Sequence, residues 1–180
     1  MKKPIPNLGL FVGLALVLAA CAPTIPDIPF DASEVAAFTA AGPGRIEGSA
    51  LYRRRDGSIV TCAAGTVLLA PDTAFTREID QRIQIAFPRD TIMAFRARYE
   101  DPALSNAFRR TVCDADGEFT FDGLAPGGWY VLTRIRTNPG NSMSRDGEVF
   151  LRQFIRVPAT GTANPVLTNR DIHYVYSDLP

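Results

Sequence analysis

His173 is the only histidine in the chain, and imidazole is the side chain most often used as a general base or a zinc ligand. A single histidine excludes a zinc site built from three histidines. Serine and aspartate are present, but nothing in their order or spacing around His173 indicates a Ser-His-Asp triad. The favoured interpretation of His173 is a structural role, and the sequence predicts no catalytic residue.

The stretch Asp114-Ala-Asp-Gly117 resembles the start of an EF-hand calcium loop. Position 5 of that loop would be Glu118, and position 12, which should be a bidentate Glu, is Ala125. An Asp-Gly pair at a tight turn is explained by backbone geometry alone. The sequence therefore predicts a turn here, with no metal and no cofactor.

Lysine occurs only at Lys2 and Lys3, within an N-terminal segment that has the features of a secretion signal. A chain cut after that signal has no lysine, so a Lys–Asn isopeptide cross-link and lysine Schiff-base chemistry are both excluded. It would carry 17 arginines against 19 acidic residues, a net charge of −2. Nucleic-acid binding needs a clustered basic excess, so no nucleic-acid partner is expected.

The N-terminus predicts a signal peptide over residues 1–20. An apolar run of 13 residues, Leu8 to Ala20, follows the two lysines and is too short to span a membrane comfortably. It ends in Leu18-Ala-Ala-Cys21, which resembles the bacterial lipoprotein box, in which the cysteine is acylated and becomes the first residue. An ordinary signal peptide is the alternative. Ala22 is not the Asp that retains lipoproteins in the inner membrane, so the resemblance implies an outer-membrane anchor facing the periplasm.

Residues 21–32 are predicted to be a lipidated tether. Pro23, Pro26 and Pro29 recur at the three-residue period of polyproline II, which disfavours a helix. Such a tether rises about 3.1 Å per residue and places the following domain roughly 30 Å from the bilayer.

Cys62 and Cys113 each end an expected strand, in a compartment that permits disulfides. The natural prediction is a bridge, which would stabilise the fold by roughly 4 kcal/mol on the loop-entropy model. Two buried free thiols are the alternative.

Residues 33–180 are predicted to form one all-β domain, an antiparallel β-sandwich of about seven strands with a short N-terminal helix and one inserted helix. Helical patterns cover 31–41 and 72–87, where Phe75, Ile79 and Ile83 are four apart. Residues 91–99 are expected to be a loop or a short helix. Strands are expected at 45–52, 58–62, 66–70, 106–113, 148–157 and 163–176, and residues 114–136 are expected to form a β-hairpin.

Several of these segments together resemble a carboxypeptidase regulatory-like domain: Ile46-Glu-Gly-Ser-Ala50, Gly65 to Pro71, and Asp116 to Val131. The resemblance covers residues 44–136 and implies a prealbumin-like (transthyretin-like) sandwich that serves as an accessory or binding module. The insertion from Asp72 to Asn106 departs from it. A hydrolase of transthyretin-like ancestry is the alternative, although this chain has one histidine and ends in Tyr-Ser-Asp-Leu-Pro180 rather than Tyr-Arg-Gly-Ser. One histidine also excludes the two-His, two-Tyr iron site of intradiol dioxygenases.

Strand alternation predicts one face of interleaved aromatic and arginine side chains, opposite the core-facing set around Trp129 and Val149. Its members are Tyr130, Arg134, Arg136, Phe150, Arg152, Phe154 and Arg156. Such a face could bind an anionic glycan, phosphate or a protein carboxylate. The alternatives are arginines paired with local acids and a face covered by the 72–87 helix. The sequence thus predicts a lipid-anchored, non-catalytic envelope module whose partner is an envelope protein or an anionic glycan.

Overall fold

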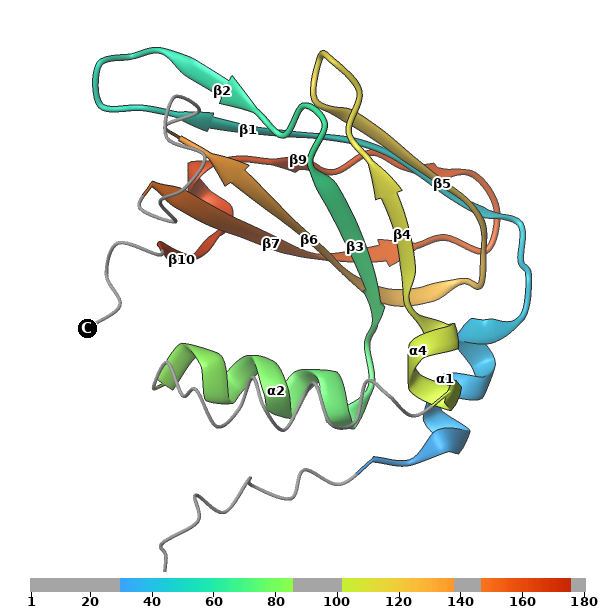
Figure 1. The fold of residues 1–180 in the computed structure, drawn as a ribbon. Coiled ribbons are helices and arrows are strands. Elements are labelled where there is room, and N and C mark those ends of the chain that lie inside the picture. The colour runs from blue at the N-terminus through green and yellow to red at the C-terminus, as the bar shows by residue number, and fades with distance from the viewer. Residues whose placement is uncertain (1–29, 86–101, 138–146, 176–180) are drawn as a thin grey trace, which may run out of the picture.

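The computed structural model describes residues 30–85, 102–137 and 147–175, and in it two β-sheets pack face to face (Figure 1). The first sheet has β1 as its central strand, paired antiparallel with β2 and β5 and parallel with β8 and β9. The second sheet has the order β10-β7-β6-β3-β4 and is antiparallel throughout. The predicted all-β sandwich is confirmed, with ten strands in the described ranges.

The strand bounds follow the alternation of apolar residues in the sequence. In the first sheet they are β1 Gly44–Arg53, β2 Ile59–Thr61, β5 Glu118–Leu124, β8 Thr162–Ala163 and β9 Val166–Leu167. In the second sheet they are β3 Thr66–Pro71, β4 Arg109–Val112, β6 Gly127–Arg136, β7 Glu148–Val157 and β10 Ile172–Val175.

Four helical segments accompany the sheets: α1 Ala32–Thr39, α2 Ala74–Ile85, α4 Pro102–Ala107 and the 3₁₀ turn η1 Asn169–Asp171. Asp31 caps α1 by accepting a hydrogen bond from the backbone N–H of Ser33 at 2.8 Å, as expected of an N-cap aspartate. Both predicted helices are confirmed within two residues at each end. Among the described residues, no helix is long and apolar enough to cross a membrane.

Two predicted strands are wrong in part. Residues 102–107 form α4, so the strand expected over 106–113 begins only at Arg109. Pro102 suits the first turn of a helix, and Leu104 and Ala107 are fully buried there, which outweighs the strand pattern. The strand expected over 163–176 is divided into β8, β9, η1 and β10, because Pro165 interrupts it and Thr168 forms a capping box with Asp171. The interpretation of residues 91–99 lies outside the described residues.

The hairpin expected over residues 114–136 is wrong. β5 pairs with β1 in the first sheet, whereas β6 pairs with β3 and β7 in the second, so the link at Ala125-Pro126 crosses from one sheet to the other. Both strands place their apolar side chains in the layer between the sheets. A hairpin within one sheet and a crossing between two sheets therefore show the same local pattern of a turn followed by alternating residues. The turn at Asp114 is present: its Oδ1 accepts from the N–H of Asp116 and Glu118 at 3.0 and 2.8 Å, and Gly117 has φ +83°.

The main core lies between the sheets and contains Trp129, whose side chain is fully buried. Its Nε1–H donates to the carbonyl of Ala125 at 3.0 Å, and Phe38 of α1 meets its ring edge-on at 4.9 Å between centroids. The predicted disulfide is confirmed: Cys62 and Cys113, in this same core, are bonded with their Cα atoms 5.8 Å apart. Cys62 follows β2 and Cys113 follows β4, so the bridge joins a strand end of each sheet.

A second apolar cluster lies on the outer face of the second sheet, where α1, α2 and α4 pack. Its buried members are Val35, Ala70, Phe75, Ile79, Leu104, Ala107 and Phe108. Phe30 contacts Phe75 edge-on at 5.6 Å, so this cluster reaches into the range 21–32 that was predicted as tether. In Figure 1 α2 runs beneath the second sheet, with α1 and α4 grouped at one end of it.

Candidate binding groove

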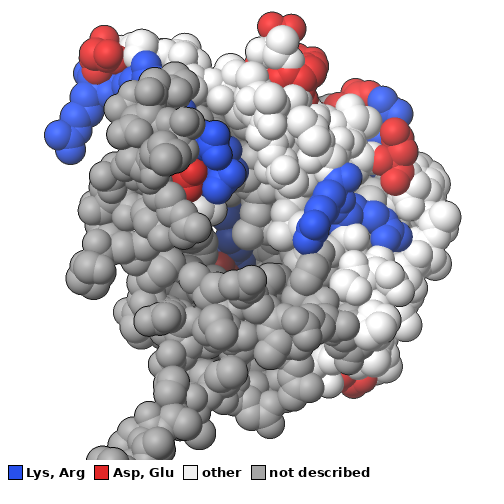
Figure 2. Space-filling view, in the orientation of Figure 1, with Lys and Arg blue, Asp and Glu red and all other residues white. Residues whose placement is uncertain are grey.

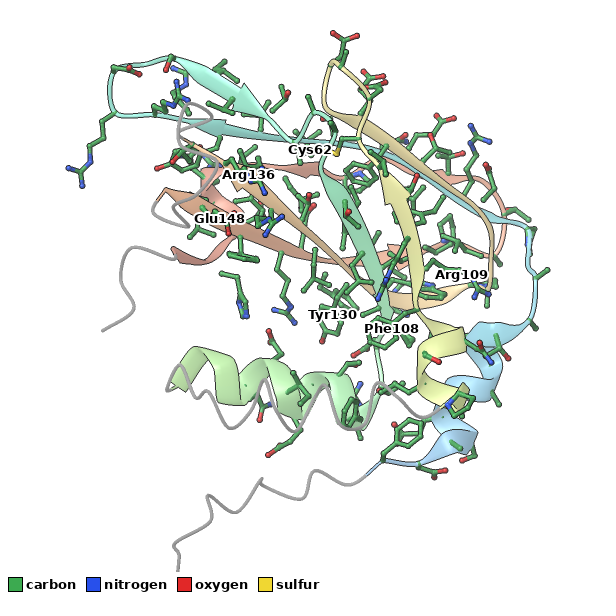
Figure 3. All side chains as sticks on the ribbon, in the orientation of Figure 1. Cys62, Phe108, Arg109, Tyr130, Arg136 and Glu148 are labelled. Carbon is green, nitrogen blue, oxygen red and sulfur yellow. A yellow bond between two sulfur atoms is a disulfide. The ribbon has the colours of Figure 1, made fainter. Side chains whose placement is uncertain are left out.

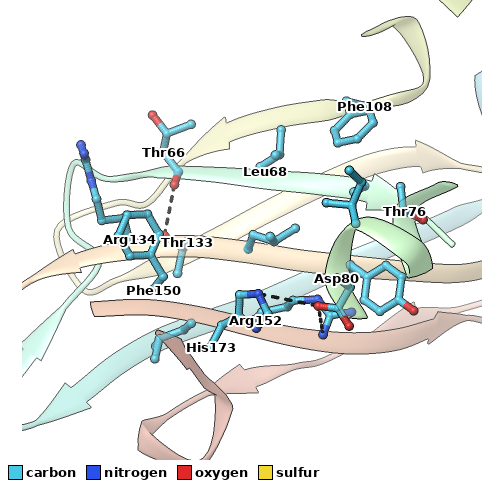
Figure 4. A pocket seen from close by; sticks show the side chains of 15 residues that line it. Thr66, Leu68, Thr76, Asp80, Phe108, Thr133, Arg134, Phe150, Arg152 and His173 are labelled. Atoms are coloured by element: carbon cyan, nitrogen blue, oxygen red, sulfur yellow. Dashed lines mark hydrogen bonds and ion pairs between the residues drawn. The ribbon is translucent and has the colours of Figure 1, made fainter. Parts of the chain in front are cut away.

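A groove of about 390 Å³ lies between α2 and the outer face of the second sheet. Small-molecule sites typically have volumes of about 300–1,000 Å³. Its floor comes from β3, β6, β7 and β10, its roof from α2, and Phe108 lies beside it. In Figure 2 a hollow opens in this face, with basic and acidic atoms visible at its bottom. Figure 4 shows the lining, formed by Thr66, Leu68, Ala70, Thr76, Ile79, Asp80, Phe108, Tyr130, Leu132, Thr133, Arg134, Phe150, Leu151, Arg152 and His173.

The start of α2 is fixed to its surroundings by hydrogen bonds. Thr76 donates its hydroxyl proton to the carbonyl of Pro71 at 2.6 Å and accepts from the N–H of Thr73 at 2.9 Å. The N–H of Ala74 donates to the carboxylate of Glu34 in α1 at 2.7 Å. Because Phe75 and Ile79 are buried four residues apart, the same face of α2 that packs on the sheet also forms the roof of the groove.

Most of the groove surface is apolar. Leu68 of β3 and Leu132 of β6 are register partners on the floor, and both are only partly buried. Ile79 and Phe108 extend the same surface toward α2 and α4, and Phe150 of β7 extends it toward the other end. Figure 3 shows Tyr130 and Phe108 pointing from the sheet toward α2. An apolar molecule placed here would exchange water for side-chain contacts along its length.

One ionic cluster lies inside the groove. Nη1 of Arg152 is 2.7 Å from Oδ1 of Asp80, and the two side chains are only 14% and 15% exposed. Nε2 of His173 is 3.7 Å from the same oxygen. Burial lowers the pKa of His173, the negative charge of Asp80 opposes that shift, and Arg152 adds to it. Near neutral pH the cluster is therefore one cation and one anion with a neutral imidazole.

Tyr130 links this cluster to the apolar floor. The Arg152 guanidinium lies 4.1 Å from the centre of the Tyr130 ring, a cation–π distance. Burial raises the pKa of Tyr130, and the charge of Asp72 and a hydrogen bond to that carboxylate raise it further. The phenol is therefore a neutral hydroxyl at physiological pH.

Two threonine hydroxyl groups of the lining are engaged in structural hydrogen bonds. Thr76 donates to the carbonyl of Pro71, and Thr133 donates to the carbonyl of Thr66 at 3.1 Å. Neither hydroxyl is directed to His173 as an activated nucleophile would be. Within residues 30–85, 102–137 and 147–175, no three His, Cys, Asp or Glu side chains are grouped to hold a metal ion. The arrangement of these residues suits binding, with polar groups that orient a ligand.

A second ionic cluster lies at the end of the groove near Arg134. Arg134 and Arg136 both contact the buried carboxylate of Glu148, each at 3.4 Å. The side chains of the two arginines are 47% and 57% exposed, whereas that of Glu148 is 6% exposed. Among the described residues, two guanidinium groups thus share one carboxylate, so these three side chains together carry one net positive charge.

The seven residues of the predicted face lie on adjacent strands but in three settings. Register partners include Tyr130 with Phe154 and Arg134 with Phe150. Tyr130, Phe150 and Arg152 line the groove, Arg134 lines its mouth beside Arg136, and Phe154 and Arg156 are exposed outside it. Both alternatives considered from the sequence therefore apply to part of the face, because α2 covers some of it and acids pair with three of its arginines.

Asp80, Leu68 and Leu132 were not predicted as site residues. Leu132 lies on the same outer face of β6 as Tyr130 and Arg134, because it occupies an even position of the strand. An apolar residue on an outward-facing position could have indicated a covered or ligand-binding surface. Asp80 lies one position after Ile79 in the α2 pattern, and nothing in the sequence indicates which arginine it meets. His173 lies beside Asp80 with its side chain 9% exposed.

No family model and no curated protein matches this sequence. Among solved structures, the fold is similar to that of a proposed carbohydrate-binding protein from Pseudomonas aeruginosa, with a TM-score of 0.58. The two sequences are 20% identical, and the match covers 79% of this chain and 100% of that one. At this identity the likeness concerns the fold, and it agrees with the sandwich described above.

Proposed function

We propose that this protein is a non-catalytic binding module of the bacterial cell envelope, anchored by lipid at Cys21, and that the groove between α2 and the second sheet is its ligand site. The anchor rests on the lipoprotein box after a 13-residue apolar run, and the module on the resemblance to carboxypeptidase regulatory-like domains. The proposed outer-membrane, periplasm-facing location rests on Ala22.

The observation that supports the binding role is the Arg152–Asp80 pair between α2 and β7. A buried ion pair seldom adds net stability, because removing two charges from water costs about as much as their attraction returns. Its position suggests another use: it fixes the distance between α2 and the floor, so the groove is preformed. A preformed site loses little entropy when a ligand binds.

A glycan is the second candidate ligand, and its place would be outside the groove. Phe154 is 46% exposed, its ring meets Tyr130 edge-on at 5.3 Å, and Arg156 is exposed two residues further along the same strand. An exposed ring beside a guanidinium suits stacking on a sugar with contact to an acidic substituent. The neighbour described as a proposed carbohydrate-binding protein favours testing this surface too.

Mass spectrometry of the mature N-terminus tests the anchor. An acylated Cys21 as the first residue is expected, together with loss of membrane association in Cys21→Ser. A free N-terminus upstream of Cys21, or a Cys21→Ser variant that stays in the membrane fraction, contradicts the anchor and leaves the groove proposal standing.

Ligand extraction tests the groove. The full chain is purified from membranes in mild detergent, washed, denatured and extracted, and the extract is compared with that of Leu132→Trp, whose ring would fill the floor. We expect a compound that copurifies with the wild type and is lost from the variant at an unchanged melting temperature. If Leu132→Trp does not fold, Leu68→Phe serves instead. No specific compound in the wild-type extract, or the same compound in both extracts, overturns the groove as the site.

A further inference from the structure

We infer that the ligand of the groove is an amphiphilic anion, with a linear apolar body along Leu68, Leu132 and Phe150 and a carboxylate or similar acidic head at Arg134. This inference rests on the groove being the ligand site. The distribution of charge and apolar surface along the groove specifies which chemical class the site recognises.

The body of the ligand is specified by the floor. Leu68 and Leu132 are register partners on β3 and β6. Phe150 lies on the adjacent β7, two residues before Arg152, the register partner of Leu132, so the three side chains form an apolar strip that runs diagonally across the strands. Burying an aliphatic chain against such a strip is favourable, because it removes apolar surface from water. A sugar would leave its hydroxyl groups without partners on the same strip, and unpaired buried hydroxyls are costly.

The inner ionic cluster does not call for a charged ligand. Arg152 and Asp80 neutralise each other at 2.7 Å, and burial favours the neutral form of His173. A charged group placed beside this pair would compete with one of its members. The charged part of a ligand is therefore expected at the other end of the groove.

At that other end the described residues carry an excess of positive charge. Arg134 lines the groove, and Figure 4 shows it with Phe150 at the end opposite Asp80. Arg134 and Arg136 share the single carboxylate of Glu148 at 3.4 Å, which is long for a charge-assisted hydrogen bond. An anionic head can take the hydrogen bonds that Glu148 leaves unsatisfied.

The order of groups along the groove fits this assignment. Phe150 and Arg134 are register partners, so the last apolar contact and the first guanidinium lie side by side on neighbouring strands. An acyl chain that ends in a carboxylate has the same order of groups, with an apolar carbon next to the acid. The matching order is what selects an amphiphile over a molecule charged at both ends.

The test uses photoaffinity labelling of the purified full chain in neutral nanodiscs. The probe is dodecanoate carrying a diazirine at mid-chain, and labelled peptides are located by mass spectrometry. Competitors are dodecanoate, dodecanol and hexagalacturonate. The variants are Leu132→Trp for the body and Arg134→Gln for the head. Arg45→Gln is the matched control, because Arg45 lies on the first sheet and pairs with Glu47 and Asp122.

We expect labelling of peptides from β6, β7 or α2, competition by dodecanoate and weak competition by dodecanol. Arg134→Gln should weaken dodecanoate competition about tenfold, the loss expected for one charge-assisted contact. Leu132→Trp should abolish labelling, and Arg45→Gln should leave it unchanged.

Three outcomes overturn the inference. Equal competition by dodecanol, with no effect of Arg134→Gln, would mean that the groove binds apolar molecules without reading charge, and the groove would remain the ligand site. Competition by hexagalacturonate alone would identify a glycan site. If Leu132→Trp leaves the labelling unchanged, the probe binds elsewhere. The groove would still be the ligand site if the extraction experiment finds a different compound that is lost in Leu132→Trp, so this failure is distinguishable from failure of the proposed function.

Discussion

The two faces of the second sheet are made by the same strands, yet they differ in how they are covered. The inner face packs against the first sheet, and Trp129, Val131 and Val149 are buried there almost completely. The outer face alternates with it residue by residue, and there α2 covers part of the surface and leaves the groove. One face is sealed by the fold itself, whereas the other depends on a helix inserted between β3 and β4.

Because of this difference, the inner-face residues of β6 and β7 should determine the stability of the fold, and their outer-face residues should determine ligand binding. A substitution on the inner face should act on folding, because a closed apolar core cannot relax around a deleted side chain. A substitution on the outer face of β6 or β7 should act mainly on the groove, since water already reaches its walls.

Trp129→Ala should lower the free energy of unfolding by up to about 5 kcal/mol. The indole is fully buried, donates to Ala125 and contacts Phe38, so its removal leaves a cavity and an unpaired carbonyl. Leu132→Ala, on the opposite face and only partly buried, should cost about 1–2 kcal/mol. Urea denaturation of both variants makes the comparison, and equal losses would refute the division between the faces.

Breaking the disulfide should cost about 4 kcal/mol on the loop-entropy model, because Cys62 and Cys113 are 51 residues apart. Cys62→Ala with Cys113→Ala is preferred to reduction, since no free thiols remain to exchange. Thermal and urea unfolding give the loss. The bridge joins strand ends of the inner core, so ligand binding at the groove should be unchanged in whatever fraction remains folded.

Asp80→Asn should cost about 2 kcal/mol, less than the 3–5 kcal/mol typical of a fully buried pair, because both partners retain about 15% exposure. The substitution leaves the Arg152 guanidinium in the groove without its counter-charge. Asp122→Asn is the matched control: its side chain is 63% exposed and pairs with Arg45, so its effect should stay within about 0.5 kcal/mol. Indistinguishable values would show that the groove pair is solvated.

The smallest effect is a pH dependence from His173. In the folded state the pKa of His173 lies below the ordinary value of 6.5. Above about pH 6.5 the imidazole is therefore neutral in both the folded and the unfolded state, and its protonation takes nothing from the free energy of unfolding. As the pH falls, the unfolded state binds a proton first, and stability is lost down through the folded pKa. Among the described residues, Asp80 and Arg152 are the charged groups that act on the ring, and of these two Asp80 opposes the loss.

Comparing wild type with His173→Gln between pH 7 and pH 5 isolates this contribution from the carboxylates, which titrate in both proteins. The wild type should lose stability more steeply than the variant. A shallower slope in the wild type would mean that Asp80 holds the imidazolium and that the charged form is favoured in the fold.

Alternation predicted the inner face well, because a period of two assigns every second residue to a core that the same strands create. Trp129 and Val131 follow from it, as do the disulfide partners at strand ends. The outer face could not be derived in this way. Arg152 is hidden because Asp80 reaches it from α2, a contact across 72 residues of chain that no local pattern encodes.

The crossing between β5 and β6 was missed for a related reason. A turn followed by alternating residues is compatible with pairing to a neighbour or to a strand of the other sheet, and only the partners of β1 decide between them. Those partners lie between residues 59 and 167, up to more than a hundred positions after β1, so a local sequence pattern cannot rank them.

The pairing of β1 with β9 also sets the order in which the molecule can be completed. Ser49 is aligned with Val166, 117 positions later, so the first strand to emerge during synthesis waits for one of the last. Contacts this distant in sequence are associated with folding in milliseconds to seconds rather than microseconds. During that interval one edge of β1 has unsatisfied N–H and C=O groups, and a chaperone that holds an extended strand would protect it from aggregation.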